Sequence, residues 1–328
     1  MKAYSLLIGM VISSQALASS FGFVDIQKSS DNKYIEMAKS TAAMVDITRL
    51  IPLNRIEDVR SLLKAVNESS KQFLPLYTPL FKSGIDYLPL YSDLMKSQGL
   101  CANESWAQKT DLSSCSGTLV SDRHIVTAGH CADIEQMCEK YAWLFDYQLD
   151  ENGERPSSYN REQVYSCKKI IKSVHSKIKI YGQFIRTDFA VIELDRPVVG
   201  RKPIELSKKK FVKPGTKIVN ISYPLGTPGK ISDVGSVAKY MYLPGYFWSN
   251  IMVFGGSSGS GMFNAETGEL VGVVSQGIKN LEDNTLKTCK RIVDVRVTDP
   301  VKNGGIVSAS AQMRRVLRTL KKMGVIKK

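Results

Sequence analysis

Residues 115–120 read CSGTLV and residues 123–127 read RHIVT, two short runs rich in β-branched and apolar residues. Similar runs follow further along the chain: FAVIEL at 189–194, KIVNI at 217–221 and LVGVV at 270–274. Many short runs of this kind, separated by Gly, Pro, Asn and Asp, are typical of an all-β barrel or sandwich. We therefore predict one β domain over residues 99–328. It ends in a helix over 309–323, whose apolar face is formed by Met313, Val316, Leu317 and Leu320.

Residues 19–98 have a different pattern. Two stretches, 33–50 and 56–73, show apolar residues at helical spacing. In the second, Ile56, Val59, Leu62, Leu63 and Val66 recur at steps of three and four. We predict a mainly helical N-terminal extension. It is a propeptide, a helical domain packed on the β domain, or both, and the sequence does not decide between these.

The first 18 residues resemble an export signal. Lys2 precedes a mostly apolar stretch that is too short to span a bilayer, and Ala-Leu-Ala at 16–18 fits a cleavage site. We predict that residues 1–18 are a signal peptide and that the product is secreted or periplasmic. No later run is apolar enough for a transmembrane helix, so we expect no integral membrane segment after the signal is removed.

The six cysteines favour disulfides, because their number is even and the chain is predicted to be exported. No Cys-x-x-Cys pair is present, so a zinc cage is not indicated, and we expect neither a metal nor a cofactor. The formal net charge is +14, and the basic residues are spread along the chain. Without a nucleic-acid motif, this charge predicts a basic surface rather than a nucleic-acid partner.

Three strings carry candidate catalytic residues in the order His, Asp, Ser. They are VTAGHC at 126–131, TDFAVIEL at 187–194 and FGGSSGSGMF at 254–263. Together with CSGTLV they resemble the trypsin/chymotrypsin-like serine peptidases over about residues 101–325. The serine loop is most similar to that of bacterial glutamyl-endopeptidase-like members.

This resemblance implies two antiparallel six-stranded β-barrels with the site between them, and a serine endopeptidase that acts on protein or peptide substrates. It implies His130 as general base, Asp188 as the carboxylate that orients it, and Ser258 as nucleophile, working through an acyl-enzyme. The backbone N–H groups of Gly256 and Ser258 would form the oxyanion hole. It also implies a disulfide between Cys115 and Cys131, which holds the loop that carries His130.

The primary specificity pocket is predicted from the same resemblance to be uncharged. Its lining residues correspond here to Met252, Ser275, Gln276, Gly277 and Gly305. The strand at 272–277 would pair with the substrate backbone, and its Ser275 would bond Asp188. None of the lining residues is charged, so we expect cleavage after a neutral or apolar residue.

The sequence also departs from the family. Ser257 replaces the aspartate that usually precedes the nucleophile, so activation by a freed N-terminal ammonium is not indicated. The cysteine that usually precedes the nucleophile is missing as well. The sequence does not determine how the remaining cysteines pair. We take Cys101 with Cys289, which leaves Cys138 with Cys167.

The same sequence allows three other interpretations. Residues 255–259 also match the G-x-S-x-G elbow of α/β-hydrolases with Ser257 as nucleophile, but that fold needs a later His and none follows His175. His124 and His175 lack a motif, so we interpret them as structural. A non-catalytic binding protein on this fold is a second alternative. A third is an enzyme kept latent by residues 19–98 acting as an intramolecular inhibitor.

Overall fold

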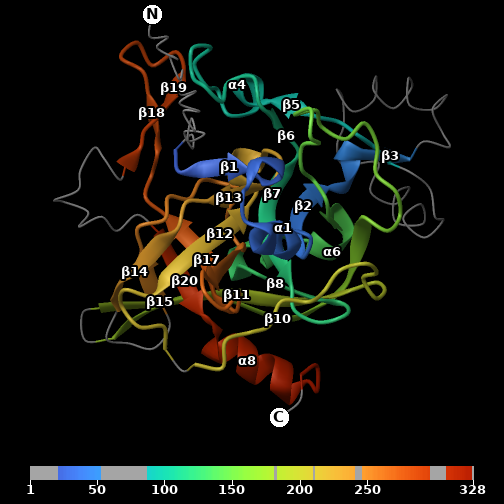
Figure 1. Cartoon of the computed structure of the whole chain (residues 1–328), viewed down its shortest axis with the longest axis vertical. Coiled ribbons are helices and arrows are strands. Elements are labelled where there is room, and N and C mark those ends of the chain that lie inside the picture. The colour runs from blue at the N-terminus through green and yellow to red at the C-terminus, as the bar shows by residue number, and fades with distance from the viewer. Residues whose placement is uncertain are drawn as a thin grey trace, which may run out of the picture.

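The computed structural model describes residues 21–52, 87–180, 183–209, 211–240, 246–295 and 308–326, and most of its elements are β-strands (Figure 1). The predicted signal peptide, the predicted helix at 56–73 and Gly305 lie outside these residues. No helix within the described ranges has the length and apolar character needed to cross a membrane.

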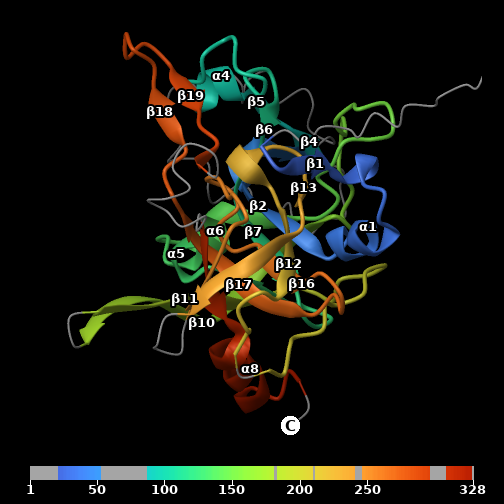
Figure 2. The same ribbon diagram turned by 60° about the vertical axis from the view of Figure 1, so that its left-hand side comes forward.

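Six strands form a closed barrel. Their order around it is β10-β11-β8-β7-β2-β9, and all neighbouring pairs are antiparallel. The strands are β2 (Thr41–Asp46), β7 (Ser113–Leu119), β8 (His124–Thr127), β9 (Tyr141–Leu144), β10 (Val164–Ile180) and β11 (Gln183–Leu194). The paired strands β10 and β11 run well beyond the rest of the barrel (Figure 2).

A second sheet has eight strands in the order β1-β13-β12-β14-β15-β20-β17-β16, with an additional pairing between β12 and β16. The strands are β1 (Phe23–Asp25), β12 (Lys217–Ser222), β13 (Lys230–Ser232), β14 (Gly235–Tyr240), β15 (Tyr246–Ser249), β16 (Gly261–Asn264), β17 (Leu270–Gly277) and β20 (Ser308–Gln312). The structure therefore confirms a mostly β fold with one closed six-stranded barrel.

Short elements complete the described chain. Three two-stranded pairs are β3 (Leu50–Pro52) with β4 (Tyr87–Pro89), β5 (Ser92–Asp93) with β6 (Thr110–Asp111), and β18 (Leu281–Asp283) with β19 (Lys290–Ile292). The α-helices are α1 (Asn32–Ala38), α4 (Leu94–Ser97), α5 (Gly129–Ala132), α6 (Met137–Lys140) and α8 (Met313–Lys322), and single 3-10 turns occupy Ile26–Lys28, Ile47–Arg49 and Pro224–Gly226.

Strand β11 shows how the apolar runs join the two sheets. Ala190 and Ile192 lie in the core inside the barrel, whereas Phe189 and Val191 belong to a second core shared with the other sheet. Alternate residues of a strand point to opposite faces, so a continuous apolar run such as FAVIEL fits a strand buried on both sides. The shared core also buries Met313, Val316 and Leu320 of α8 and packs against Leu317, as predicted for the apolar face of that helix. The helix begins only at Met313, because residues 308–312 form β20 and pair with β15 and β17.

The predicted helix at 33–50 is wrong beyond Ala38. Helix α1 begins after Asp31, whose carboxylate accepts a hydrogen bond from the Lys33 N–H at 2.9 Å, and it ends at Ala38. Residues 41–46 instead form β2, which pairs with β7 on one side and β9 on the other. A short apolar run such as Ala42–Val45 fits a buried strand as well as a buried helix, and barrel closure decides.

The prediction of a mainly helical extension over 19–98 therefore fails where the structure describes it. Residues 21–52 and 87–98 contribute strand β1 to the second sheet, strand β2 to the barrel and only two short helices. The three disulfides join Cys101 to Cys289, Cys115 to Cys131 and Cys138 to Cys167, the pairs taken from the sequence.

Candidate active site

His130 lies in the one-turn helix α5, which follows strand β8 directly. Its backbone N–H donates to Asp188 Oδ1 at 2.9 Å, and its ring Nδ1 lies 2.8 Å from Asp188 Oδ2. Gly129 lets this helix lie close to the backbone of β10, because a Cβ at that position would lie 2.1 Å from the Val174 carbonyl oxygen. The side chain is 31% exposed, so the ring remains open to the cleft although one edge is held by Asp188.

Asp188 is almost fully buried in β11 and accepts one further hydrogen bond, from Ser275 Oγ at 2.5 Å. Burial alone would raise the pKa of Asp188. The hydrogen bonds from His130 and Ser275 outweigh it, so the pKa lies below its ordinary value and the carboxyl stays ionised at neutral pH. A buried carboxylate held in this way can orient an imidazole ring and stabilise its protonated form.

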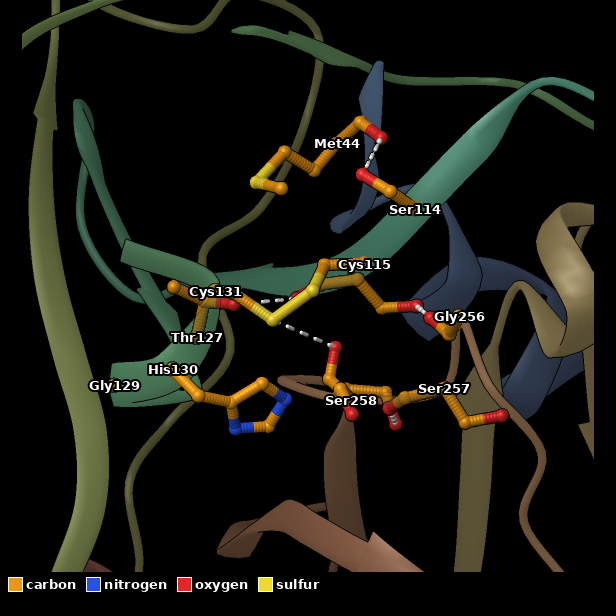
Figure 3. Close-up of a disulfide and its surroundings, with 12 residues drawn as sticks. Met44, Ser114, Cys115, Thr127, Gly129, His130, Cys131, Gly256, Ser257 and Ser258 are labelled. Atoms are coloured by element: carbon orange, nitrogen blue, oxygen red, sulfur yellow. Dashed lines mark hydrogen bonds between the residues drawn. A yellow bond between two sulfur atoms is a disulfide. The ribbon is translucent and has the colours of Figure 1, made fainter. Parts of the chain in front are cut away.

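The disulfide between Cys115 and Cys131 joins β7 to the helix that carries His130 (Figure 3). The Cys131 sulfur also lies 3.7 Å from the Ser258 carbonyl oxygen, so the same bridge contacts the serine loop. Cys115, His130 and Cys131 are close enough together to suggest a metal site. The two sulfurs are bonded to each other, however, and metals are bound by free thiolates, so these residues do not provide one.

The two neighbouring serines of the loop at 255–261 have different surroundings. Ser257 is fully buried, and its Oγ lies 3.2 Å from Ser222 Oγ. Ser258 is partly exposed and lies on the side of the loop that faces His130 (Figure 3). Of the two serines that the sequence offered as nucleophiles, the structure thus places Ser258 beside His130 and Ser257 in the protein interior.

Hydrogen bonds from β7 fix the backbone of this loop. Ser116 Oγ donates to the Gly256 carbonyl at 2.8 Å, and the Ser116 N–H donates to the Ser258 carbonyl at 2.8 Å. Gly256 has φ +85°, and a Cβ there would lie 2.5 Å from the Tyr223 carbonyl, so only glycine fits. Among the described residues, neither the Gly256 nor the Ser258 N–H has a hydrogen-bond acceptor. Both donors remain available for an anionic oxygen.

Buried polar contacts hold the part of the loop that follows Ser258. The Asn220 side chain donates to Ser260 Oγ at 2.8 Å and to the Gly261 carbonyl at 2.9 Å. Ser260 Oγ in turn donates to the Ser257 carbonyl at 2.6 Å. Asn220 lies in β12, and nothing in its local sequence marked it as a support of the serine loop.

The predicted pocket residues do not all meet at one surface. Ser275 and Gln276 line a cleft of about 500 Å³ together with His130 and Asp188. Met252 instead lies in a buried apolar cluster with Trp106 and Phe254, and Gly277 is not part of the cleft lining. Ser275 contributes its hydroxyl to Asp188 rather than to a pocket wall.

His175 belongs to the same cleft, although it was interpreted from the sequence as structural. Its ring centroid lies 5.7 Å from that of His130. Tyr246 and Ser176 complete the lining. No spacing in the sequence marks these residues, because they reach the site only through the pairing of β10 with β11 and through the position of β15.

Part of the chain is similar to a known protein family. Residues 115–273 match the family of trypsin-like peptidase domains. A search of curated proteins finds no match to the chain. Among solved structures, the chain is similar to the VesB protease of Vibrio cholerae, with 11% identity, a TM-score of 0.48, and 93% of this chain and 67% of that chain covered.

A second solved structure, a Glu endopeptidase in complex with MPD, has 17% identity and a TM-score of 0.40, with 68% of this chain and 89% of that chain covered. The assignment of the chain to the trypsin-like peptidases rests on the family match and on the order of the His, Asp and Ser motifs.

Proposed function

Since the chain belongs to the trypsin-like serine peptidases and is a serine endopeptidase, we propose that it is an exported enzyme whose catalytic triad is His130, Asp188 and Ser258. The observation that carries this proposal is the pair of hydrogen bonds, at 2.9 and 2.8 Å, by which Asp188 holds His130 next to the Ser258 loop. They leave His130 a single ring nitrogen, Nε2, to act on substrate and nucleophile.

The reaction follows from this arrangement. His130 Nε2 takes the proton of Ser258 Oγ as that oxygen attacks the peptide carbonyl. The C–N bond then breaks, and His130 returns the proton to the leaving amine. A water molecule, deprotonated by His130, attacks the acyl-enzyme and releases the second product. Asp188 remains ionised throughout and stabilises the imidazolium that forms, in line with the lowered pKa of its carboxyl.

The oxyanion of each tetrahedral intermediate would be bound by the N–H groups of Gly256 and Ser258. The backbone carbonyls of Gly256 and Ser258 each accept a hydrogen bond from Ser116, which supports a fixed orientation of the two N–H donors. Donors that are already oriented cost no reorganisation when charge develops, and loss of one typically lowers kcat by about 10²–10³-fold.

We infer that the second sheet is the second barrel of the family. In support of this, six of its strands are linked in a ring, because β16 pairs with both β17 and β12.

We also infer that residues 21–52 stay in the mature enzyme, since removal of β2 would open the first barrel between β7 and β9. An activating cleavage near residue 99 would have to leave this segment bound.

We further propose that the chain is exported, as its N-terminal sequence and three disulfides favour, and that it cleaves after a neutral or apolar residue. The pocket residues expected from the sequence carry no charge, and the segment before the serine loop is apolar, with Met252, Val253 and Phe254 all buried.

A fluorophosphonate probe tests the triad directly. We expect the folded protein to be labelled, and labelling to be lost in Ser258→Ala and in His130→Ala, with kcat on peptides lower by roughly 10⁶-fold. Ser257→Ala is the matched control and should still be labelled. Labelling that survives in Ser258→Ala but not in Ser257→Ala would contradict the assignment of the nucleophile. Absence of labelling in the folded wild type would contradict the proposed activity.

A further inference from the structure

The cleft beside the proposed triad is lined partly by residues that have no role in the reaction just described. Its volume is about 500 Å³, and three of its lining residues, His130, Asp188 and Ser275, belong to the hydrogen-bonded site described above. The rest of its lining consists of His175, Ser176, Tyr246 and Gln276. A concave surface that continues from a reactive histidine is a place where a substrate side chain would lie.

His175 reaches this position through the register of the long hairpin. In the pairing of β10 with β11, His175 is the direct cross-strand partner of Asp188. Cross-strand partners stand on the same face of a sheet, so His175 and Asp188 are presented to the same cleft. The imidazole of His175 is 51% exposed, and its centroid lies 5.7 Å from that of His130.

No carboxylate of the described chain is within hydrogen-bond distance of His175. Asp188 is occupied by His130 and Ser275, which hold both of its oxygens. The other acidic neighbour is Asp133, whose Oδ2 lies 3.9 Å from His175 Nδ1 and whose side chain is 69% exposed. The His175 ring is therefore able to donate a hydrogen bond to an incoming acidic group.

The charge of the hairpin favours such a group. Residues 172–186 contain three lysines, one arginine and His175, and no acidic residue. Lys168 and Lys169 share the single carboxylate of Glu193, at 2.8 and 3.2 Å, so one positive charge of the two remains. Lys172 is exposed and makes no ion pair within the described residues. A local excess of positive charge attracts anionic ligands and disfavours cationic ones.

We propose that His175 is a specificity-determining residue that binds an acidic side chain of the substrate, on the N-terminal side of the cleaved bond. The inference rests on the proposed peptidase activity. A substrate that pairs with the end of β17, as expected from the sequence, would run along Ser275 and Gln276, which line the same cleft as His175.

Matched peptides test this preference. They carry Asp or Asn at one position, scanned over the residues before the scissile bond, with a fixed apolar residue at the cleavage site. We expect kcat/KM to be roughly 10-fold higher for Asp than for Asn at the position that contacts His175. In His175→Ala this ratio should fall to within about twofold of one, and in His175→Gln it should be intermediate. Lys39→Ala, which removes an exposed lysine outside the hairpin and the cleft, should keep the wild-type ratio.

A second readout does not depend on catalysis. In Ser258→Ala protein, fluorescence anisotropy should show tighter binding of the labelled Asp peptide than of the Asn peptide, and added His175→Ala should abolish the difference. Equal cleavage and equal binding of the two peptides, or a preference that survives in His175→Ala, would overturn the role of His175 while leaving the peptidase proposal intact. An unlabelled, inactive protein that still binds the Asp peptide through His175 would overturn the peptidase proposal alone.

Discussion

Two buried carboxylates in this molecule have similar chemistry and different consequences. Asp188 in β11 is bound to His130, and Asp25 in β1 is bound to Lys230 of β13. Both carboxylates have only about a tenth or less of their side-chain surface exposed. Burial disfavours ionisation of each, and the bound base more than compensates, so the pKa of each carboxyl lies below its usual value.

The two bases differ in their access to solvent. His130 is 31% exposed and opens onto the cleft, so its second ring nitrogen is available to a substrate. Lys230 is 3% exposed, its ammonium lies 5.3 Å from the centre of the Trp106 ring, and burial lowers its pKa to about 8. A carboxylate–base pair becomes a reactive site only where the base keeps a free atom at the surface. Elsewhere it holds two strands together at a desolvation cost.

The largest expected effect separates the two pairs by activity. Asp188→Asn should lower kcat by roughly 10⁴-fold, because the amide no longer fixes the tautomer of His130 or stabilises its charge. Asp25→Asn should leave kcat of the folded enzyme within about twofold of wild type, since that pair does not touch the cleft. Steady-state kinetics on a peptide substrate would measure both. Comparable losses in the two variants would mean that the Asp25–Lys230 pair also shapes the site.

The second prediction separates the pairs by stability. Lys230→Met should lower the free energy of unfolding by about 3 kcal/mol, because Asp25 would stay buried without its main partner. Chemical denaturation would measure this change. Lys28→Met is the control, as Lys28 is half exposed and 3.9 Å from Asp25, and it should have an effect below about 0.5 kcal/mol. The double variant Asp25→Leu/Lys230→Met should recover most of the loss, and failure to recover would indicate that the charges contribute net stability.

Ser275→Ala should have a smaller effect on catalysis than Asp188→Asn. It removes one of three hydrogen bonds to the Asp188 carboxylate, and a bond to a charged group contributes about 1.5–3 kcal/mol. We expect kcat/KM to fall by roughly 10-fold and the pKa of Asp188 to rise, because its charged form loses one hydrogen bond. An NMR titration of the Asp188 carboxyl carbon would measure this rise, and an unchanged pKa would show that His130 alone sets the ionisation of Asp188.

The smallest effect concerns acid stability. Both carboxyls have a pKa that is lower in the folded protein than in the unfolded chain, where it is about 3.9. Their contribution to stability is therefore complete above that value and is lost as the pH falls through the folded pKa. Thermal melts between about pH 2 and 6 should show that the melting temperature depends less on pH in Asp25→Asn and in Asp188→Asn than in wild type. Unchanged slopes in both variants would contradict the assigned pKa directions.

Much of the site could be predicted because each of its catalytic residues lies in a short, contiguous sequence motif. His130 and Asp188 each follow or open a strand-like run, and the glycines around Ser258 meet a backbone requirement that is itself local. The choice between Ser257 and Ser258 was an inference from loop register. The structure adds a physical reason, because Ser257 lies buried against Ser222 of a different strand.

What the sequence by itself determined is the kind of chemistry available, the strand-rich fold class and the order of the candidate residues, because residue type and spacing are local properties. Only the tertiary structure decided that Thr41–Asp46 is a barrel strand, that His175 faces the cleft, and that Asp25 meets Lys230 across 205 residues. Each of these depends on pairing between distant strands. Such pairing is set by barrel closure and shared burial rather than by the periodicity of any one segment.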